Sequence, residues 1–107
     1  MITQKGCIKM MEVYVATIFN YVELLGGKKE QKIMLKEGNT IKDLLDTLIT
    51  MYGDKLKEEL FDKFELGKIS GGKALLLNGS NIFALNGLDT TLKSGDKFLL
   101  LPPMAGG

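Results

Sequence analysis

The sequence predicts a single α+β domain, in which a mixed sheet packs on one main helix. Three observations predict it. β-branched and aromatic residues alternate near the start of the chain, residues 41–52 carry an amphipathic helical pattern, and an apolar run at residues 98–101 precedes two prolines. The chain has 107 residues, of which 45% are hydrophobic, so it can bury one modest core but not two.

The first part of the chain predicts a β-hairpin. Residues 12–18 are rich in β-branched residues and form the first expected strand. Residues 19–25 form a short helical turn that Gly26-Gly27 stops, and residues 31–36 alternate again as a second strand. The strand residues expected to share one face are Val13, Val15, Thr17, Ile33 and Leu35.

The main helix follows at residues 41–52. Its apolar stripe consists of Ile41, Leu44, Leu45, Leu48, Ile49 and Tyr52, at the spacing of one helix face. Thr40 can cap the N-terminus, Asp43 stands at the reciprocal position of a capping box, and Gly53 ends the helix. Residues 54–64 predict a second, weaker helix that contains Leu56, Leu60, Phe61 and Phe64.

The last third of the chain predicts short strands around one turn. Residues 74–77 form an apolar strand that ends at Asn78-Gly79, and residues 82–85 are a candidate return strand. After a turn at residues 93–96, residues 97–101 form the last strand. Its apolar side chains lie on both faces, which predicts a strand that is central in the sheet, exposed to a partner, or both.

This order of elements is that of the β-grasp fold, which we expect over residues 11–101. Met10-Met11 indicates where the folded unit begins, so residues 1–10 are expected to be a disordered leader. Residues 102–107 are expected to form a flexible tail, called the C-terminal tail below.

Composition excludes several classes of function. The 14 basic and 13 acidic residues give a net charge of +1, so binding of nucleic acid through bulk positive charge is not expected. No apolar run could span a bilayer and no secretory signal opens the chain, which predicts a cytoplasmic protein without a membrane partner. The chain has no histidine, so Cys7, its single cysteine, is expected to be an unremarkable thiol.

No catalytic or metal site is predicted. Residues 67–73 fit the GxxxxGK pattern of a phosphate-binding loop, but Ala74 and a strand follow where the pattern needs Ser or Thr and a helix. Histidine-based catalytic triads and metal sites with histidine ligands are excluded because the chain has no histidine. The acidic residues around 58–65 alternate with lysines, as on a solvated helix face.

The C-terminal tail is the best indicator of function. The sequence ends with Gly106-Gly107, and a glycyl carboxylate without nearby side chains can enter a narrow enzyme channel. Pro102 and Pro103 restrict φ to about −65° and favour an extended exit from the last strand. The absence of other chemistry indicates a protein on which enzymes act.

The sequence resembles the MoaD/ThiS superfamily of ubiquitin-like sulfur carriers. The resemblance rests on Leu-Pro-Pro-Met-Ala-Gly-Gly at residues 101–107 after Ser94-Gly95-Asp96, on residues 11–26, on the helix entry at residues 38–45 and on Leu77-Asn78-Gly79. Pro-Pro before the tail favours the branch that contains the small subunit of molybdopterin synthase. Met104 departs from the pattern, which has Val there.

The resemblance implies a non-catalytic carrier without a bound cofactor. A ubiquitin-activating-like adenylyltransferase consumes ATP to convert the Gly107 carboxylate to an acyl-adenylate. A sulfur donor protein then converts it to a thiocarboxylate, which the large subunit of molybdopterin synthase uses. Pro102, Pro103, Met104, Ala105 and Gly106 place the tail in the partner's channel. Phe98, Leu100 and Leu101 are candidates for the partner surface, with core packing as an equally weighted role.

Three alternatives stay open at this point. The first is a ubiquitin-like protein modifier that joins target lysines through Gly107, and the second is a sulfur donor for tRNA thiolation. The third is a plain β-grasp binding module whose tail is inert.

Overall fold

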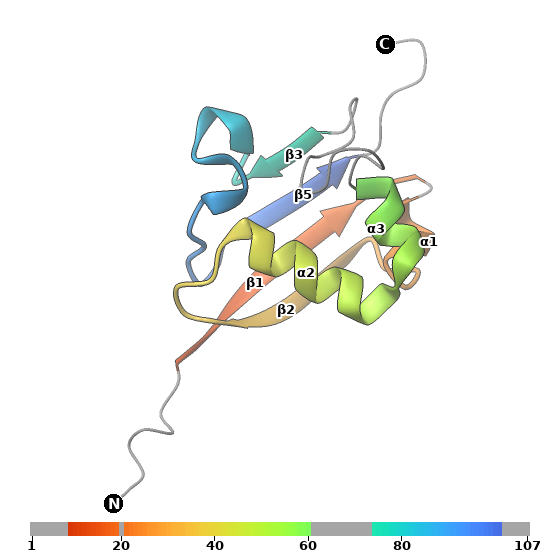
Figure 1. Ribbon diagram of the computed structural model, residues 1–107, viewed down its shortest axis with the longest axis horizontal. Coiled ribbons are helices and arrows are strands. Elements are labelled where there is room, and N and C mark those ends of the chain that lie inside the picture. Colours follow the sequence, from red (N-terminus) through yellow and green to blue (C-terminus); the bar gives the residue numbers. More distant parts are fainter. Residues whose placement is uncertain (1–8, 20, 61–73, 102–107) are drawn as a thin grey trace, which may run out of the picture.

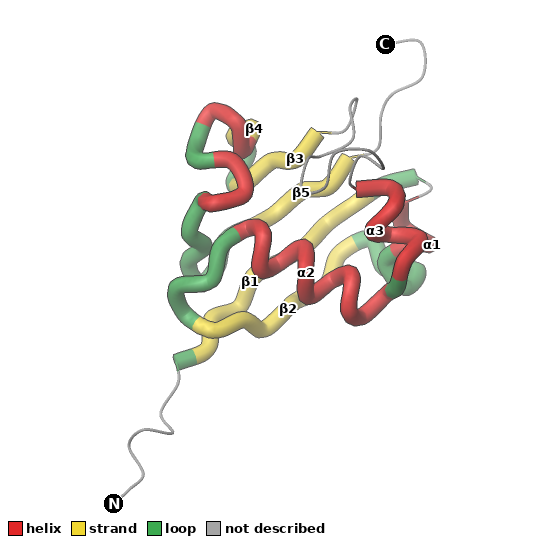
Figure 2. The backbone as a smooth tube through the Cα atoms, viewed as in Figure 1, coloured by secondary structure: helices red, strands yellow, loops and turns green. Residues whose placement is uncertain are grey.

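The computed structural model describes residues 9–19, 21–60 and 74–101. A five-stranded mixed sheet lies behind helix α2 (Figures 1 and 2). The α+β, β-grasp prediction is confirmed. The elements in chain order are β1 (Met10–Thr17), α1 (Tyr21–Leu24), β2 (Glu30–Lys36), α2 (Ile41–Tyr52), α3 (Asp54–Leu60), β3 (Ala74–Leu77), β4 (Ser80–Asn81), the 3-10 helices η2 (Ile82–Ala84) and η3 (Gly87–Asp89), and β5 (Lys97–Leu101).

The strand order β2-β1-β5-β3-β4 places β5 in the middle of the sheet. β1 pairs with β2 antiparallel from Met10↔Lys36 to Ala16↔Glu30, which forms the predicted hairpin. β1 pairs with β5 in parallel, with Thr17 opposite Leu100 at the end of the register. β3 flanks the other side of β5 in antiparallel orientation. The last strand is therefore central, as its apolar composition predicted.

One layer of side chains between the sheet and the helices forms the core. Alternate residues of β1 and β2 point into it, as the period of a strand requires. Four of the six residues in the predicted stripe of α2 are buried, and Ile49 and Tyr52 pack partly buried at its edge. The members with no exposed surface include Val13, Tyr21, Leu25, Ile41, Leu44, Leu45, Leu48, Leu56, Leu60, Ile82, Phe98 and Leu100.

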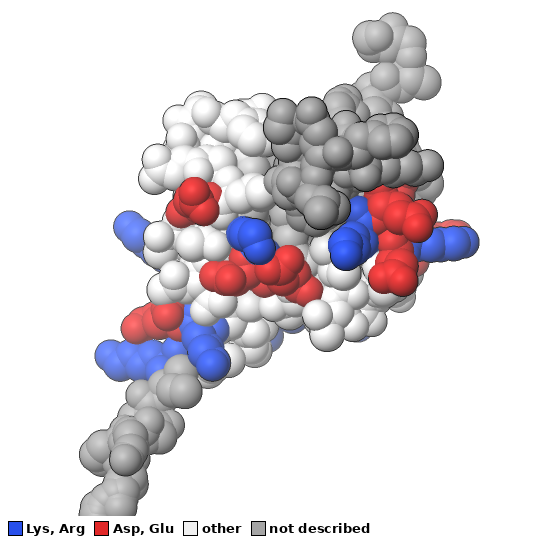
Figure 3. Space-filling view, in the orientation of Figure 1, with Lys and Arg blue, Asp and Glu red and all other residues white. Residues whose placement is uncertain are grey.

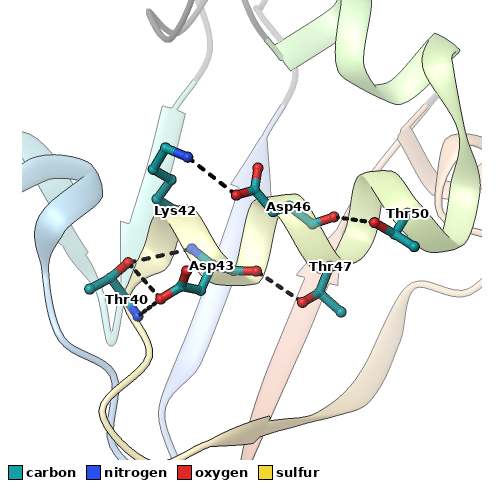
Figure 4. Close-up of polar contacts among 6 residues, drawn as sticks. All are labelled: Thr40, Lys42, Asp43, Asp46, Thr47 and Thr50. Atoms are coloured by element: carbon teal, nitrogen blue, oxygen red, sulfur yellow. Dashed lines mark hydrogen bonds and ion pairs between the residues drawn. The ribbon is translucent and has the colours of Figure 1, made fainter.

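Helix α2 has the predicted bounds and caps (Figure 4). The Thr40 backbone N–H donates to Asp43 Oδ2 at 2.8 Å, and the Asp43 N–H donates to Thr40 Oγ1 at 3.4 Å, which completes a capping box. At the other end, Gly53 has φ 99°, a conformation that favours glycine, and its N–H donates to the Ile49 carbonyl.

Two sequence expectations need correction. β1 begins at Met10, which pairs with Lys36, so the ordered domain includes a residue that was assigned to the leader. Residues 82–85 do not form the return strand: β4 is Ser80–Asn81, and residues 82–84 are 3-10 helix. The Asn81 side chain accepts a hydrogen bond from the Phe83 N–H at 2.8 Å, so it caps a helical turn and ends the strand.

The second helix, α3, falls within the predicted range 54–64. Phe61 and Phe64, together with Cys7 and the glycine-rich segment 67–73, lie outside the described residues. No helix among residues 9–19, 21–60 and 74–101 is long and apolar enough to cross a membrane.

Tyr21 of α1 is a buried polar residue in this core. Its side chain has no exposed surface, and its hydroxyl has no hydrogen-bond partner among the described residues. Burial, and secondarily the Glu59 carboxylate, raises the pKa of Tyr21 to about 12. The folded protein therefore holds this proton at pH values where the unfolded chain, with a pKa of 10.0, releases it.

We expect Tyr21→Phe to be as stable as the parent or more stable at pH 7, by up to about 1 kcal/mol, because it removes an unpaired buried hydroxyl. Since the folded-state pKa is raised, the parent should lose stability as the pH rises from 10 toward 12, and Tyr21→Phe should lose less. Urea unfolding of both proteins at pH 7 and pH 11 measures this. A variant less stable than the parent at pH 7 would show that the hydroxyl has a stabilising partner.

Candidate functional site

The candidate site is the end of the sheet from which the C-terminal tail leaves. Leu101 is the last residue of β5, and Pro102, Pro103, Met104, Ala105, Gly106 and Gly107 lie outside the described residues. β1 and β5 are parallel, so Ile18 and Leu101 leave the sheet at the same end. The structure therefore places the connection from β1 to α1 beside the start of the tail.

The partner-surface prediction for β5 is wrong for two of its three residues. Phe98 and Leu100 have no exposed surface and belong to the core under α2, so they have the packing role that the sequence left open. Leu101 alternates to the opposite face and is half-buried, as is Leu99. Leu101 remains the candidate for partner contact among the three, because its side chain reaches the surface.

The start of β5 is held by polar contacts between two turns. The Asn78 side chain donates to Asp96 Oδ1 at 3.0 Å and accepts from the Lys97 N–H at 2.9 Å. The Asp96 carboxylate also accepts from the Lys93 N–H at 2.8 Å. Asn78 has φ 51°, a conformation that asparagine tolerates better than most residues. These contacts fix the strand that carries the tail at its first residue.

The sheet face opposite α2 is mixed in character. Half-buried apolar side chains on neighbouring strands share it, namely Ala16, Leu76, Leu99 and Leu101. A shallow hollow of about 530 Å³ lies there, with Tyr14, Glu30 and Lys97 among its lining residues. Lys97 Nζ is 3.9 Å from Glu30 Oε2, an exposed pair that contributes little to stability. On the helix side, charged side chains of both signs are interspersed (Figure 3).

A second hollow, of about 520 Å³, lies at the end of β1. Ile18, Phe19, Val22, Glu23 and Lys29 line it. Phe19 is 65% exposed and has φ 56°, which is rare for a bulky side chain. Strained conformations of this kind cluster at functional sites. The sequence analysis missed this feature, because it predicts a single short helical turn over residues 19–25.

We call Ile18, Phe19, Val22 and Leu101 the tail-exit surface. Each is at least partly exposed: Ile18, Phe19 and Val22 line the hollow at the end of β1, and Leu101 is the last residue of the neighbouring strand β5. Within the described residues no group of three or more His, Cys, Asp or Glu side chains could hold a metal ion.

Comparison with known proteins identifies the family. Residues 17–107 match the model of the ThiS family, a range that includes β5 and the whole C-terminal tail. The chain belongs to the ThiS family. Within the ThiS/MoaD ubiquitin-like superfamily, members are small carrier proteins and are generally not catalytic. No sequence among the curated proteins matches this ThiS-family chain.

Solved structures give the same assignment. The chain is similar to small archaeal modifier protein 1 (SAMP1) from Methanosarcina acetivorans, with 34% identity and a TM-score of 0.75 over 92% of this chain and 99% of that one. It is similar to the HVO 2177 protein of Haloferax volcanii, with 28% identity and a TM-score of 0.74 over 92% and 88% of the two chains. A putative molybdopterin converting factor, subunit 1, from Pyrococcus furiosus has 26% identity and a TM-score of 0.67 over 88% and 99%.

The backbone of Phe19 provides a test of the local geometry. At φ 56° any residue with a Cβ is strained by about 1–2 kcal/mol relative to glycine. The free energy of unfolding of Phe19→Gly should therefore exceed that of Phe19→Ala by about 1 kcal/mol. Urea unfolding of both variants measures the difference. In ordinary extended or helical backbone alanine is favoured over glycine, so an alanine variant that is equally stable or more stable would contradict the left-handed conformation.

Proposed function

We propose that this ThiS-family protein is a sulfur carrier for molybdopterin synthesis. The Gly107 carboxylate attacks the α-phosphorus of ATP in an adenylyltransferase, pyrophosphate leaves, and an acyl-adenylate forms. Sulfide-level sulfur from a donor protein then displaces AMP and leaves a thiocarboxylate. The large subunit of molybdopterin synthase takes the sulfur. All catalysis takes place in the partners, and the carrier contributes a deliverable carboxylate.

The observation that carries the proposal is that β5, the strand that directly precedes the tail in the sequence, is central in the sheet. The family match extends through Gly107, and the tail follows a central strand with neighbours on both sides. Pro102-Pro103 restrict the first tail residues, and Gly106-Gly107 leave the reacting end without side chains. The likeness to the molybdopterin converting factor subunit of Pyrococcus furiosus supports this branch of the family.

The tail-exit surface is the proposed contact for the enzyme that receives the tail. An enzyme that closes around the tail must approach the end of β5, where the half-buried Leu101 lies, and the exposed Phe19 follows the end of the neighbouring strand β1. Apolar and aromatic side chains are enriched in the centres of interfaces. Phe19→Gly keeps the backbone conformation and removes the ring, so it tests the contact without adding strain.

Intact-mass spectrometry tests the proposed chemistry. After incubation with ATP, the cognate adenylyltransferase and sodium sulfide, the parent mass should rise by the difference between sulfur and oxygen. Deletion of Gly107, or extension by one alanine after it, should abolish the shift, because the activated carboxylate is displaced. Lys42→Ala, at an exposed position in the first turn of α2, is a control that leaves β5 and the turns around it unchanged. A parent protein that gives no adenylate with an active cognate enzyme would contradict the proposal.

A protein modifier is the second candidate, and the 34% identity to a small archaeal modifier protein favours it. The same acyl-adenylate would then form an isopeptide bond with a lysine of a target protein. Affinity-tagged protein in cells should give high-mass conjugates that disappear when Gly107 is deleted. Conjugates without a thiocarboxylate would favour the modifier, and a thiocarboxylate without conjugates would favour the sulfur carrier. Thiolation of tRNA, a third fate of the same sulfur, would show as thiolated nucleosides that depend on Gly107.

A further inference from the structure

Thr17 forms an unusual contact at the end of β5. It is the last residue of β1 and is only 2% exposed. Its hydroxyl donates to the Leu100 carbonyl oxygen at 2.7 Å, across 83 positions of sequence. Leu100 is the penultimate residue of β5, so this contact lies one residue before the strand ends.

Packing alone does not explain a threonine here. Valine has nearly the same shape, forms strands as well, and would bury no hydroxyl in a position surrounded by apolar residues. The hydroxyl is satisfied only because the Leu100 carbonyl accepts its hydrogen bond. The role of the Thr17 hydroxyl at this core position is therefore its hydrogen bond to β5.

The backbone shows why a side chain makes this bond. The Thr17 N–H points away from β5 and donates to the carbonyl of Lys29, the residue before β2, at 2.9 Å. The chain then turns away at Phe19, and the parallel register with β5 ends at Thr17↔Leu100. The Thr17 hydroxyl continues the connection between β1 and β5 at the position where the backbone of β1 leaves the sheet.

We propose that Thr17 is a positioning residue for the C-terminal tail, an inference that rests on the proposed carrier function. Leu101 still pairs with Ala74 of β3, and the Thr17 hydroxyl holds the Leu100 carbonyl from the β1 side, so it fixes the direction in which the chain leaves β5 after Leu101. Pro102-Pro103 transmit that direction because their φ angles are restricted. For a six-residue tail that reaches about 20 Å, a rotation of about 10° at Leu101 moves the far end by about 3 Å.

Adenylation kinetics test the proposal. In ATP–pyrophosphate exchange by the cognate adenylyltransferase, Thr17→Val should raise the KM for the carrier about tenfold and leave kcat within about twofold. The reason is that fewer molecules present the tail correctly, whereas a tail that has entered the channel reacts normally. Thr17→Ser keeps the hydroxyl and should restore KM to within about threefold of the parent.

Thr90 offers a matched control. Like Thr17 it is buried, and in a loop beside α2, not on β5, its hydroxyl donates to the Gly87 carbonyl at 2.8 Å and accepts from the Asn86 N–H at 3.0 Å. Thr90→Val removes both hydrogen bonds, so it should lose at least as much stability in urea unfolding as Thr17→Val, with no change in KM. If both valine variants shift KM equally, or neither does, Thr17 has a structural role only and the proposal fails.

Backbone ¹⁵N relaxation gives a second measurement that needs no enzyme. The Leu101 amide should show increased fast motion in Thr17→Val but not in Thr17→Ser or Thr90→Val. Unchanged relaxation at Leu101 in Thr17→Val would overturn the positioning role. If the parent is not adenylated at all, the proposed function fails, and the relaxation data alone decide the role of Thr17.

Discussion

Parallel pairing of β1 with β5 is the constraint on which the rest of the structure depends. Parallel neighbours cannot be joined by a tight turn, so the segment between them must cross over the sheet, and α2 provides that cover. The crossover buries one face of both strands beneath the helix and leaves the other face open. It also brings the end of β1 beside the end of β5. The tail therefore leaves from a place that two distant parts of the sequence build together.

The two ends of β5 are held by different means. At its start, the side chains of Asn78 and Asp96 bond to backbone groups of neighbouring turns, so exposed polar contacts fix the strand. At its end, the Thr17 hydroxyl makes a buried bond to Leu100. Between them, Phe98 fills the core. A strand held at both ends and packed in its middle is a rigid support, which suits a carrier that must present a short tail to an enzyme.

In the proposed function, the enzymes carry the catalytic groups and this protein carries only the group that they activate. A carrier that is passed between enzymes needs one group that partners can activate and a surface that they can recognise. Phe19 and Leu101 are the proposed surface, and the Gly107 carboxylate is the proposed group. The chain shares its fold with a small archaeal modifier protein and with a molybdopterin converting factor subunit, so the same framework suits a sulfur carrier and a protein modifier. In the proposed function, the enzyme that binds the tail determines the product.

The sequence by itself determined most of the secondary structure, although residues 82–84 form a 3-10 helix where a return strand was predicted, and its tail is the basis of the proposed functional group. The period of Ile41–Tyr52 with Thr40 and Gly53 set the helix, alternation set β1 and β2, and the tail suggested a carrier, because these signals act within a few residues. Only the tertiary structure decided which side of β5 is buried. Apolar residues on both faces do not say which face α2 covers, so Phe98 and Leu100 were indistinguishable from Leu101. It also decided the bond from Thr17 to Leu100, since that bond joins strands that are distant in the chain.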